Sequence, residues 1–174
     1  GLARSAAERA ASRPQGRPLF AGHAALPWPD EPHLVLWHAQ TLLREYRGDG
    51  HIALLLTEGL DGLGALITHA ATGSISAEAL RTTRAWGERD WAAGQERLRA
   101  RGWLDDGPQL ALTEEGQRRR QSIEDRTDDL AVYPYEAIGA DGCHWLAELA
   151  APLSRAVLAA DLGFPATLGA RYSS

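Results

Sequence analysis

Two histidines and several charged side chains lie close together between residues 38 and 51. His38, Thr41 and Glu45 are spaced i, i+3 and i+7, so a helix would bring them to one face. Glycines on both sides of Asp49 allow a tight chain reversal, which would return Asp49 and His51 toward that face. Buried polar groups must be paired, and such pairing shifts pKa values. We therefore predict a ligand-binding site formed by His38, Thr41, Arg44, Glu45, Arg47, Asp49 and His51.

Three interpretations of this cluster remain open. In a structural one, Asp49 caps a helix at Gly50, and Arg44 or Arg47 pairs with Glu45. In the second, the histidines and arginines bind a polar or acidic small molecule. The third, an acid–base or metal site, is the least favoured because the cluster has no close ligand pair such as His-x-x-x-His. The sequence therefore names no catalytic residue, metal ligand or cofactor, and whether the protein is an enzyme stays open.

The composition limits the class of protein. The 174 residues include 23 acidic residues and 18 basic ones, all arginine, which gives a net charge of −5 and fits one domain with arms. The single cysteine, Cys143, excludes an intramolecular disulfide and favours a reducing compartment. No stretch approaches the roughly 18 to 20 uncharged apolar residues of a membrane helix. We expect a cytoplasmic protein without membrane contact. Because the chain starts at Gly1, we also expect a missing N-terminal part of the same polypeptide.

The first half of the chain divides into an arm and a layer of core helices. Residues 1–32 should hold the end of a helix and then an ordered arm that is too rich in proline for helix. Residues 33–73 should hold the core helices. Apolar spacing predicts a first helix that stops at Gly48, a second over 50–57 and a third over 61–71.

The second half follows a recognisable order of elements. Residues 74–132 should form a helix from Ser76, a helix after Gly87, a two-stranded ribbon over 103–112 and a long helix opened by Thr113. Residues 133–174 should form a last helix over about 143–162 and a tail. This order predicts a mainly α fold with a small β-wing. We therefore predict a winged helix-turn-helix whose flanking helices form a homodimer.

Two segments carry resemblances to known families. The run ERLRARGWLDDGPQLALTEEGQ, residues 96–117, resembles the recognition helix, wing and following helix of MarR (multiple-antibiotic-resistance) regulators. That likeness covers roughly residues 60–132. The segment LWHAQTLLREYRGDGHIALLLTEGLDGLGALITHAATG, residues 36–73, is similar to actinobacterial winged-helix proteins of about 280 residues, of which this chain looks like the C-terminal part. The resemblance implies a fold and supplies no reaction.

The charges on the expected DNA-reading surface argue against tight DNA binding. Aligned on the regulator pattern, the leading turn of the recognition helix carries Glu88 and Asp90, and the wing tip carries Asp105 and Asp106. Since affinity for DNA comes largely from neutralised phosphates, we expect no specific complex tighter than about micromolar. The residues that could contact DNA are Arg81, Arg84, Arg89, Gln95 and Arg99.

Two functions follow from these patterns. In the first, the winged helix is a scaffold for a small-molecule site that serves sequestration, sensing or catalysis, for example in actinobacterial secondary metabolism. The alternative is a MarR-like, ligand-responsive transcriptional regulator that binds DNA. The acidic leading turn and wing favour the first function, and the usual employment of the fold favours the second.

Overall fold

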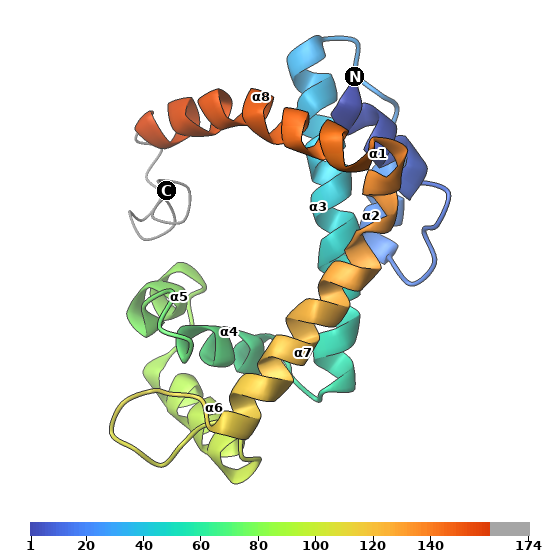
Figure 1. The fold of residues 1–174 in the computed structure, drawn as a ribbon. Coiled ribbons are helices and arrows are strands. Elements are labelled where there is room, and N and C mark those ends of the chain that lie inside the picture. The colour runs from blue at the N-terminus through green and yellow to red at the C-terminus, as the bar shows by residue number, and fades with distance from the viewer. Residues whose placement is uncertain (161–174) are drawn as a thin grey trace. The chain divides into compact units, whose positions relative to one another are not determined.

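The computed structural model describes residues 1–160 and divides into two compact units. Unit 1 consists of Gly1–Leu54 and Glu124–Ala156, and unit 2 consists of Leu55–Ile123 together with the described residues that follow Ala156. Within the described residues the elements are α-helices and one 3₁₀ helix, η1, with no strand (Figure 1). In chain order they are α1 (Leu2–Ala10), α2 (Pro18–Ala24), α3 (Pro32–Thr57), α4 (Gly62–Ala70), α5 (Ala77–Thr83), α6 (Glu88–Ala100), α7 (Glu114–Ala131), η1 (Tyr133–Ala137) and α8 (Gly139–Ala159).

The core of unit 1 is built on small residues of α1. Its buried alanines, Ala3, Ala6, Ala7 and Ala10, are spaced at helical intervals and let the helix approach its neighbours closely. Phe20 of α2 and Tyr46 of α3 meet edge to face in this core, with ring centroids 5.1 Å apart. The predicted arm is not free of helix, because α2 lies within it. Pro18 occupies the first turn of α2, where the missing N–H of proline costs nothing.

The predicted helix break at Gly48 is wrong. It runs without interruption from Pro32 to Thr57, so the predicted first and second helices are one element and no chain reversal occurs at residues 48–50. Gly50 is buried, and a Cβ at this position would lie 3.6 Å from Cβ of Leu130 on α7. Packing against α7 therefore outweighs the low helix propensity of glycine.

Unit 2 is organised around α4. Asp61 caps this helix by accepting the Gly64 N–H at 2.6 Å, and Ser76 caps α5 by accepting the Ala79 N–H at 3.0 Å. On α6, Gly94 lies so close to α4 that an added Cβ would be 2.6 Å from Cδ1 of Ile67. The two caps confirm the predicted starts of α4 and α5, and the close approach at Gly94 packs α6 against α4.

The predicted β-wing is wrong. The connection between α6 and α7 contains one isolated antiparallel bridge, between Leu104 and Leu112, and no strand. The Asp105 side chain accepts the Gly107 N–H at 3.1 Å and so begins a turn directly after the bridge, which leaves the pairing at this one position. After the loop, Thr113 caps α7 by accepting the Gly116 N–H at 2.9 Å, as predicted.

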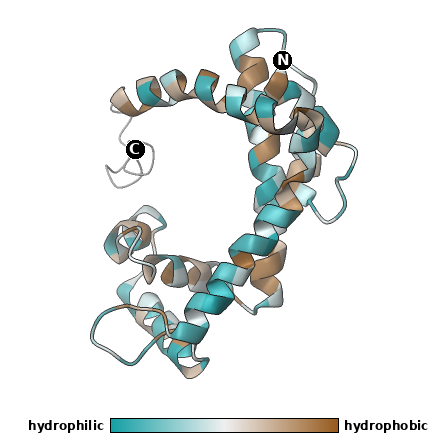
Figure 2. Ribbon diagram, in the orientation of Figure 1, coloured by the Kyte–Doolittle hydropathy of each residue, from teal (hydrophilic) through white to brown (hydrophobic). Residues whose placement is uncertain are grey.

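The last two helices differ in composition. Figure 2 shows α7 as mostly hydrophilic, and α8 carries apolar residues along its length, none of which is buried. Helix α8 begins at Gly139, four residues before the predicted start, and ends at Ala159. The predicted end of this helix at Leu162 and the predicted tail lie outside the described residues. No single helix between residues 1 and 160 is long and apolar enough to cross a membrane. Helices α3 and α4, which are separated by a bend, reach the required length and apolar character only when they are taken together.

Candidate nucleic-acid interface

The predicted ligand cluster on α3 splits between different neighbours, all within unit 1. The His38 ring packs edge-on against Trp28, with centroids 4.7 Å apart, and its Nε2 is buried without a partner among the described residues. Thr41 donates to the carbonyl of Trp37, one turn earlier in the same helix, at 3.0 Å. Glu45 is buried and pairs with the exposed Arg44 next to it.

The remaining members of the cluster hold other helices in place. The Oδ2 atom of Asp49 accepts the Phe20 N–H at 2.8 Å and so caps α2, and Asp49 is only 7% exposed. His51 Nδ1 lies 2.9 Å from the Thr127 hydroxyl on α7. These contacts match the structural interpretation of the cluster, with one change: Asp49 caps α2 and not its own helix.

Arg47 is committed to α7 in the same way. Its guanidinium donates to Glu124 at 3.0 Å and to Asp128 at 3.1 Å. Burial lowers the pKa of Arg47, but the two hydrogen bonds and the negative charges of Asp128 and Glu124 together outweigh burial and leave the pKa raised. The structure therefore distributes the predicted site residues over contacts with α2, α7 and Trp28, and their role toward a ligand stays a prediction.

The turn between α5 and α6 and the first helical turn after it carry four exposed charged side chains, Arg84, Glu88, Arg89 and Asp90. Ala85 adopts a left-handed backbone conformation, with φ of +54°, and the Trp86 N–H donates back to the Arg81 carbonyl at 3.0 Å. Trp91 and Leu98 are buried and fix α6 on the core of the unit. Residues 82–90 are all exposed as a result.

Two arginines of this turn are free. Arg84 at the end of α5 and Arg89 in the first turn of α6 are exposed and have no hydrogen bond or ion pair within residues 1–160. Gly87, the N-cap residue of α6, has no side chain to accept the first amides of the helix. Uncapped amides and the positive end of a helix dipole attract phosphate oxygens.

The other residues predicted to contact DNA are occupied or partly buried. Arg81 lies 3.5 Å from Glu88, and Arg99 pairs with Glu96 at 2.6 Å while donating to the Asp105 carbonyl at 3.1 Å. Gln95 is half-buried on α6.

Of the four acidic residues that the sequence places on the expected DNA-reading surface, two have partners within the fold. Glu88 has Arg81 as a partner, and Asp105 is used by its own loop. Asp90 in the first turn of α6 and Asp106 in the following loop remain exposed. At the start of α6, the exposed carboxylate of Asp90 therefore stands against two free arginines and a helix N-terminus.

The order of helices and the family comparison agree. A helix-turn-helix family model matches residues 1–164. The chain belongs to this helix-turn-helix family. No curated protein and no solved structure shows significant similarity to it. In this helix-turn-helix protein, α4, the α5–α6 turn and α6 follow the predicted order, whereas the likeness to MarR regulators goes beyond what the family match shows.

Sequence reasoning named Arg84 and Arg89 as residues that could contact DNA, but it did not predict the backbone turn that presents them. Its left-handed residue is an alanine, and alanine gives no signal for that conformation. The open helix N-terminus could have been found, because Gly87 stands where Ser76 and Thr113 cap α5 and α7.

Proposed function

We propose that the protein binds duplex DNA through the α5–α6 turn, mainly by contacts to the phosphate backbone. The observation that carries the proposal is the pair of free arginines, Arg84 and Arg89, on either side of the uncapped start of α6. Phosphate contacts come from arginine side chains and helix N-termini, and they fix a protein on the duplex. Helix-turn-helix proteins use such contacts as transcriptional regulators, and we propose the same role for this protein.

The affinity should be modest. Unit 2 between Leu55 and Ile123 contains nine arginines and ten acidic residues, so it has no excess positive charge. The carboxylate of Asp90, in the first turn of α6, repels the same phosphates that Arg84 and Arg89 attract. We therefore expect a dissociation constant of about micromolar at physiological salt. The homodimer and the small-molecule ligand expected from the sequence remain predictions.

The test is a binding selection followed by variant analysis. The protein selects duplexes from a random-sequence pool, and fluorescence anisotropy then measures the affinity for a selected and a scrambled duplex. The double variant Arg84→Ala/Arg89→Ala should bind both duplexes about tenfold or more weakly, because it loses two phosphate contacts.

The control is Arg155→Ala, which removes one arginine charge from an exposed position on α8, in unit 1. It should bind within about twofold of wild type, since it leaves both arginines of the turn in place and a single exposed charge is screened by salt. All three substitutions are at exposed positions, so circular dichroism melting curves should be unchanged. The proposal fails if no duplex is enriched, or if the double variant binds as well as Arg155→Ala.

A further inference from the structure

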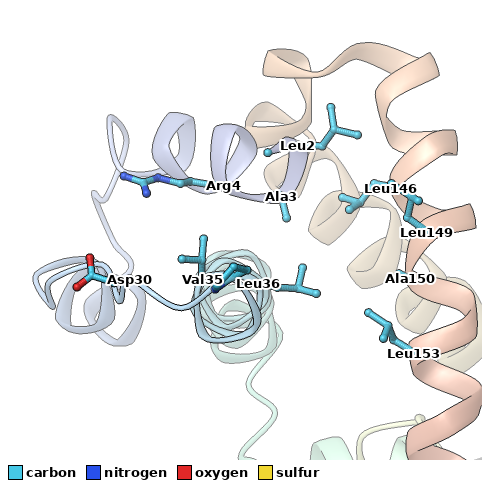
Figure 3. Close-up of a pocket in the computed structure, with 12 residues that line it drawn as sticks. Leu2, Ala3, Arg4, Asp30, Val35, Leu36, Leu146, Leu149, Ala150 and Leu153 are labelled. Atoms are coloured by element: carbon cyan, nitrogen blue, oxygen red, sulfur yellow. The ribbon is translucent and has the colours of Figure 1, made fainter.

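The apolar groove of unit 1 and the outward face of α6 in unit 2 offer different chemistry to a partner. The groove lies between α1, the start of α3 and α8, and apolar side chains such as Leu36, Leu149 and Leu153 line it (Figure 3). Apolar contact is non-directional, so it does not select one partner over another. The face of α6 carries charged groups at fixed positions, and the hydrogen bonds of such groups can distinguish one base from another.

The outward face of α6 is defined by the residues that the helix buries. Trp91, Gly94 and Leu98 are buried, and their spacing of three and four residues places them on one side of the helix. The exposed residues on the opposite side are Arg89, Ala92, Ala93, Glu96 and Ala100. This outward face therefore presents one arginine, one glutamate and three short alanines.

Glu96 extends furthest from the middle of this face. Its side chain is 73% exposed, and the alanines around it are too short to cover it. In helix-turn-helix proteins the second helix of the motif lies in the major groove, and α6 is that helix here. Glu96 lies two helical turns after Arg89, about 10 Å further along the helix. A groove that accepts the start of α6 therefore brings the Glu96 carboxylate to the base edges.

The carboxylate of Glu96 is held in place by Arg99. Nη1 of Arg99 donates to Oε1 of Glu96 at 2.6 Å, and Nε of Arg99 donates to the backbone carbonyl of Asp105 at 3.1 Å. The guanidinium is thus fixed by both the helix and the loop after it. Oε2 of Glu96 has no hydrogen bond within residues 1–160, so one carboxylate oxygen is available in a defined position.

A carboxylate accepts hydrogen bonds and donates none, which limits the bases it can read. The donors on base edges in the major groove are the N4 amino group of cytosine and the N6 amino group of adenine. Adenine also presents its N7 acceptor beside the amino group, and an acceptor repels a carboxylate. Cytosine is therefore the base that fits Glu96.

We propose that Glu96 selects a cytosine in the major groove of the duplex that the protein binds. This base choice rests on the DNA binding proposed above and adds a sequence preference to the phosphate contacts of Arg84 and Arg89. Arg99 is a positioning residue that acts through Glu96. Because the charge of Glu96 repels phosphates, this residue contributes preference and not affinity.

The test measures base preference position by position. Selection from the random-sequence pool gives an enriched duplex, and each of its base pairs is then changed in turn to the other three. Fluorescence anisotropy measures the affinity of the whole chain for every duplex. At one position, wild type should bind the cytosine duplex about fivefold or more tightly than the others.

Three variants separate preference from affinity. Glu96→Gln should move the preference at this position from cytosine to adenine, because an amide donates to N7 and accepts from the N6 amino group. Glu96→Ala should bind all four base pairs within about twofold of one another, with no loss of mean affinity, since a repulsive charge is removed. Arg99→Ala should also reduce the cytosine preference, and an unchanged preference would contradict its positioning role. Melting curves show whether each variant is folded.

The matched control is Glu115→Gln on α7. Its carboxylate pairs with Arg118, three residues later, at 2.7 Å, as Glu96 pairs with Arg99. This variant should keep the base preference of wild type. A cytosine preference that survives in both Glu96 variants would overturn the base choice and leave the DNA binding intact, and so would equal binding of all base pairs by wild type. Failure of the pool to yield any enriched duplex would overturn both proposals.

Discussion

The polar residues of α3 and those of the α5–α6 turn differ in how they are used. On α3, the charges of Asp49 and Arg47 are committed to α2 and α7 of the same unit. At the turn, Arg84 and Arg89 have no partner within the described chain. A charge that is removed from water must be paired, so partners inside the fold indicate a structural role. Clustering in the sequence is therefore a weaker guide to function than free, exposed charge.

The largest loss of stability is expected from a substitution at Gly116, on α7 in unit 2. A Cβ at this position would lie 2.2 Å from the backbone oxygen of Trp103, which already accepts the Thr113 N–H at 3.0 Å. Because a backbone atom cannot move aside, Gly116→Ala should lower the free energy of unfolding by about 3 kcal/mol. Urea denaturation measures this. The control, Gly62→Ala, faces open space in α4 and should change stability by less than about 1 kcal/mol. Equal stability of the two variants would contradict the packing described for unit 2.

The next effect concerns the structural use of charge in unit 1. Asp49→Ala leaves the buried Phe20 N–H without an acceptor and removes the cap of α2. It should cost about 2 kcal/mol of stability and leave DNA affinity unchanged. Asp128→Ala removes an exposed carboxylate that also faces Arg47 and should cost less than about 1 kcal/mol. A stable Asp49→Ala variant with altered DNA affinity would reverse the roles of the two regions.

A smaller change should sharpen the role of the turn. Asp90→Asn removes a carboxylate from the first turn of α6 and should tighten DNA binding about two- to fivefold, because one repulsive charge toward phosphate is lost. The same change should lower stability by about 0.3 to 1 kcal/mol, since the carboxylate favours the positive end of the helix dipole. Anisotropy and thermal melting measure the two effects. Asp129→Asn, at an exposed position on α7, should change neither, and weaker DNA binding by Asp90→Asn would count against the proposed contacts.

The smallest effect is expected at His38. Its Nε2 is buried without a partner in the described residues, and its ring packs edge-on against Trp28. Phenylalanine keeps the ring contact and removes the buried nitrogen, so His38→Phe should change stability by less than about 1 kcal/mol. Differential scanning calorimetry measures this. A loss well above that range would show that the nitrogen is used, as the predicted ligand site requires.

Local signals predicted much of unit 2. Asp61, Ser76 and Thr113 are residue types that cap helices, and each accepts the amide three residues later in the structure. Such signals act over one helical turn, so a single sequence is enough to read them. The helix-turn-helix order followed from them.

The candidate sites could not be predicted in the same way because long-range contacts decide them. Gly48 and Gly50 are typical of a helix end, yet packing of Gly50 against α7 keeps α3 continuous. Whether an arginine is free depends on neighbours that only the fold supplies, as the contact of Arg81 with Glu88 shows. Asp105 is a second example. The sequence predicts it as an acidic group of the wing, but in the structure its carboxylate accepts the Gly107 N–H.

The central claim is that the phosphate contacts of this protein come from the α5–α6 turn. The most direct measurement is the slope of log affinity against log salt concentration for a selected duplex, because this slope counts the phosphates that the protein neutralises. For Arg84→Ala/Arg89→Ala the slope should be smaller than that of wild type by about 2, one for each contact removed, while Arg155→Ala keeps the wild-type slope. An unchanged slope in the double variant would show that DNA, if bound at all, is held elsewhere on the chain.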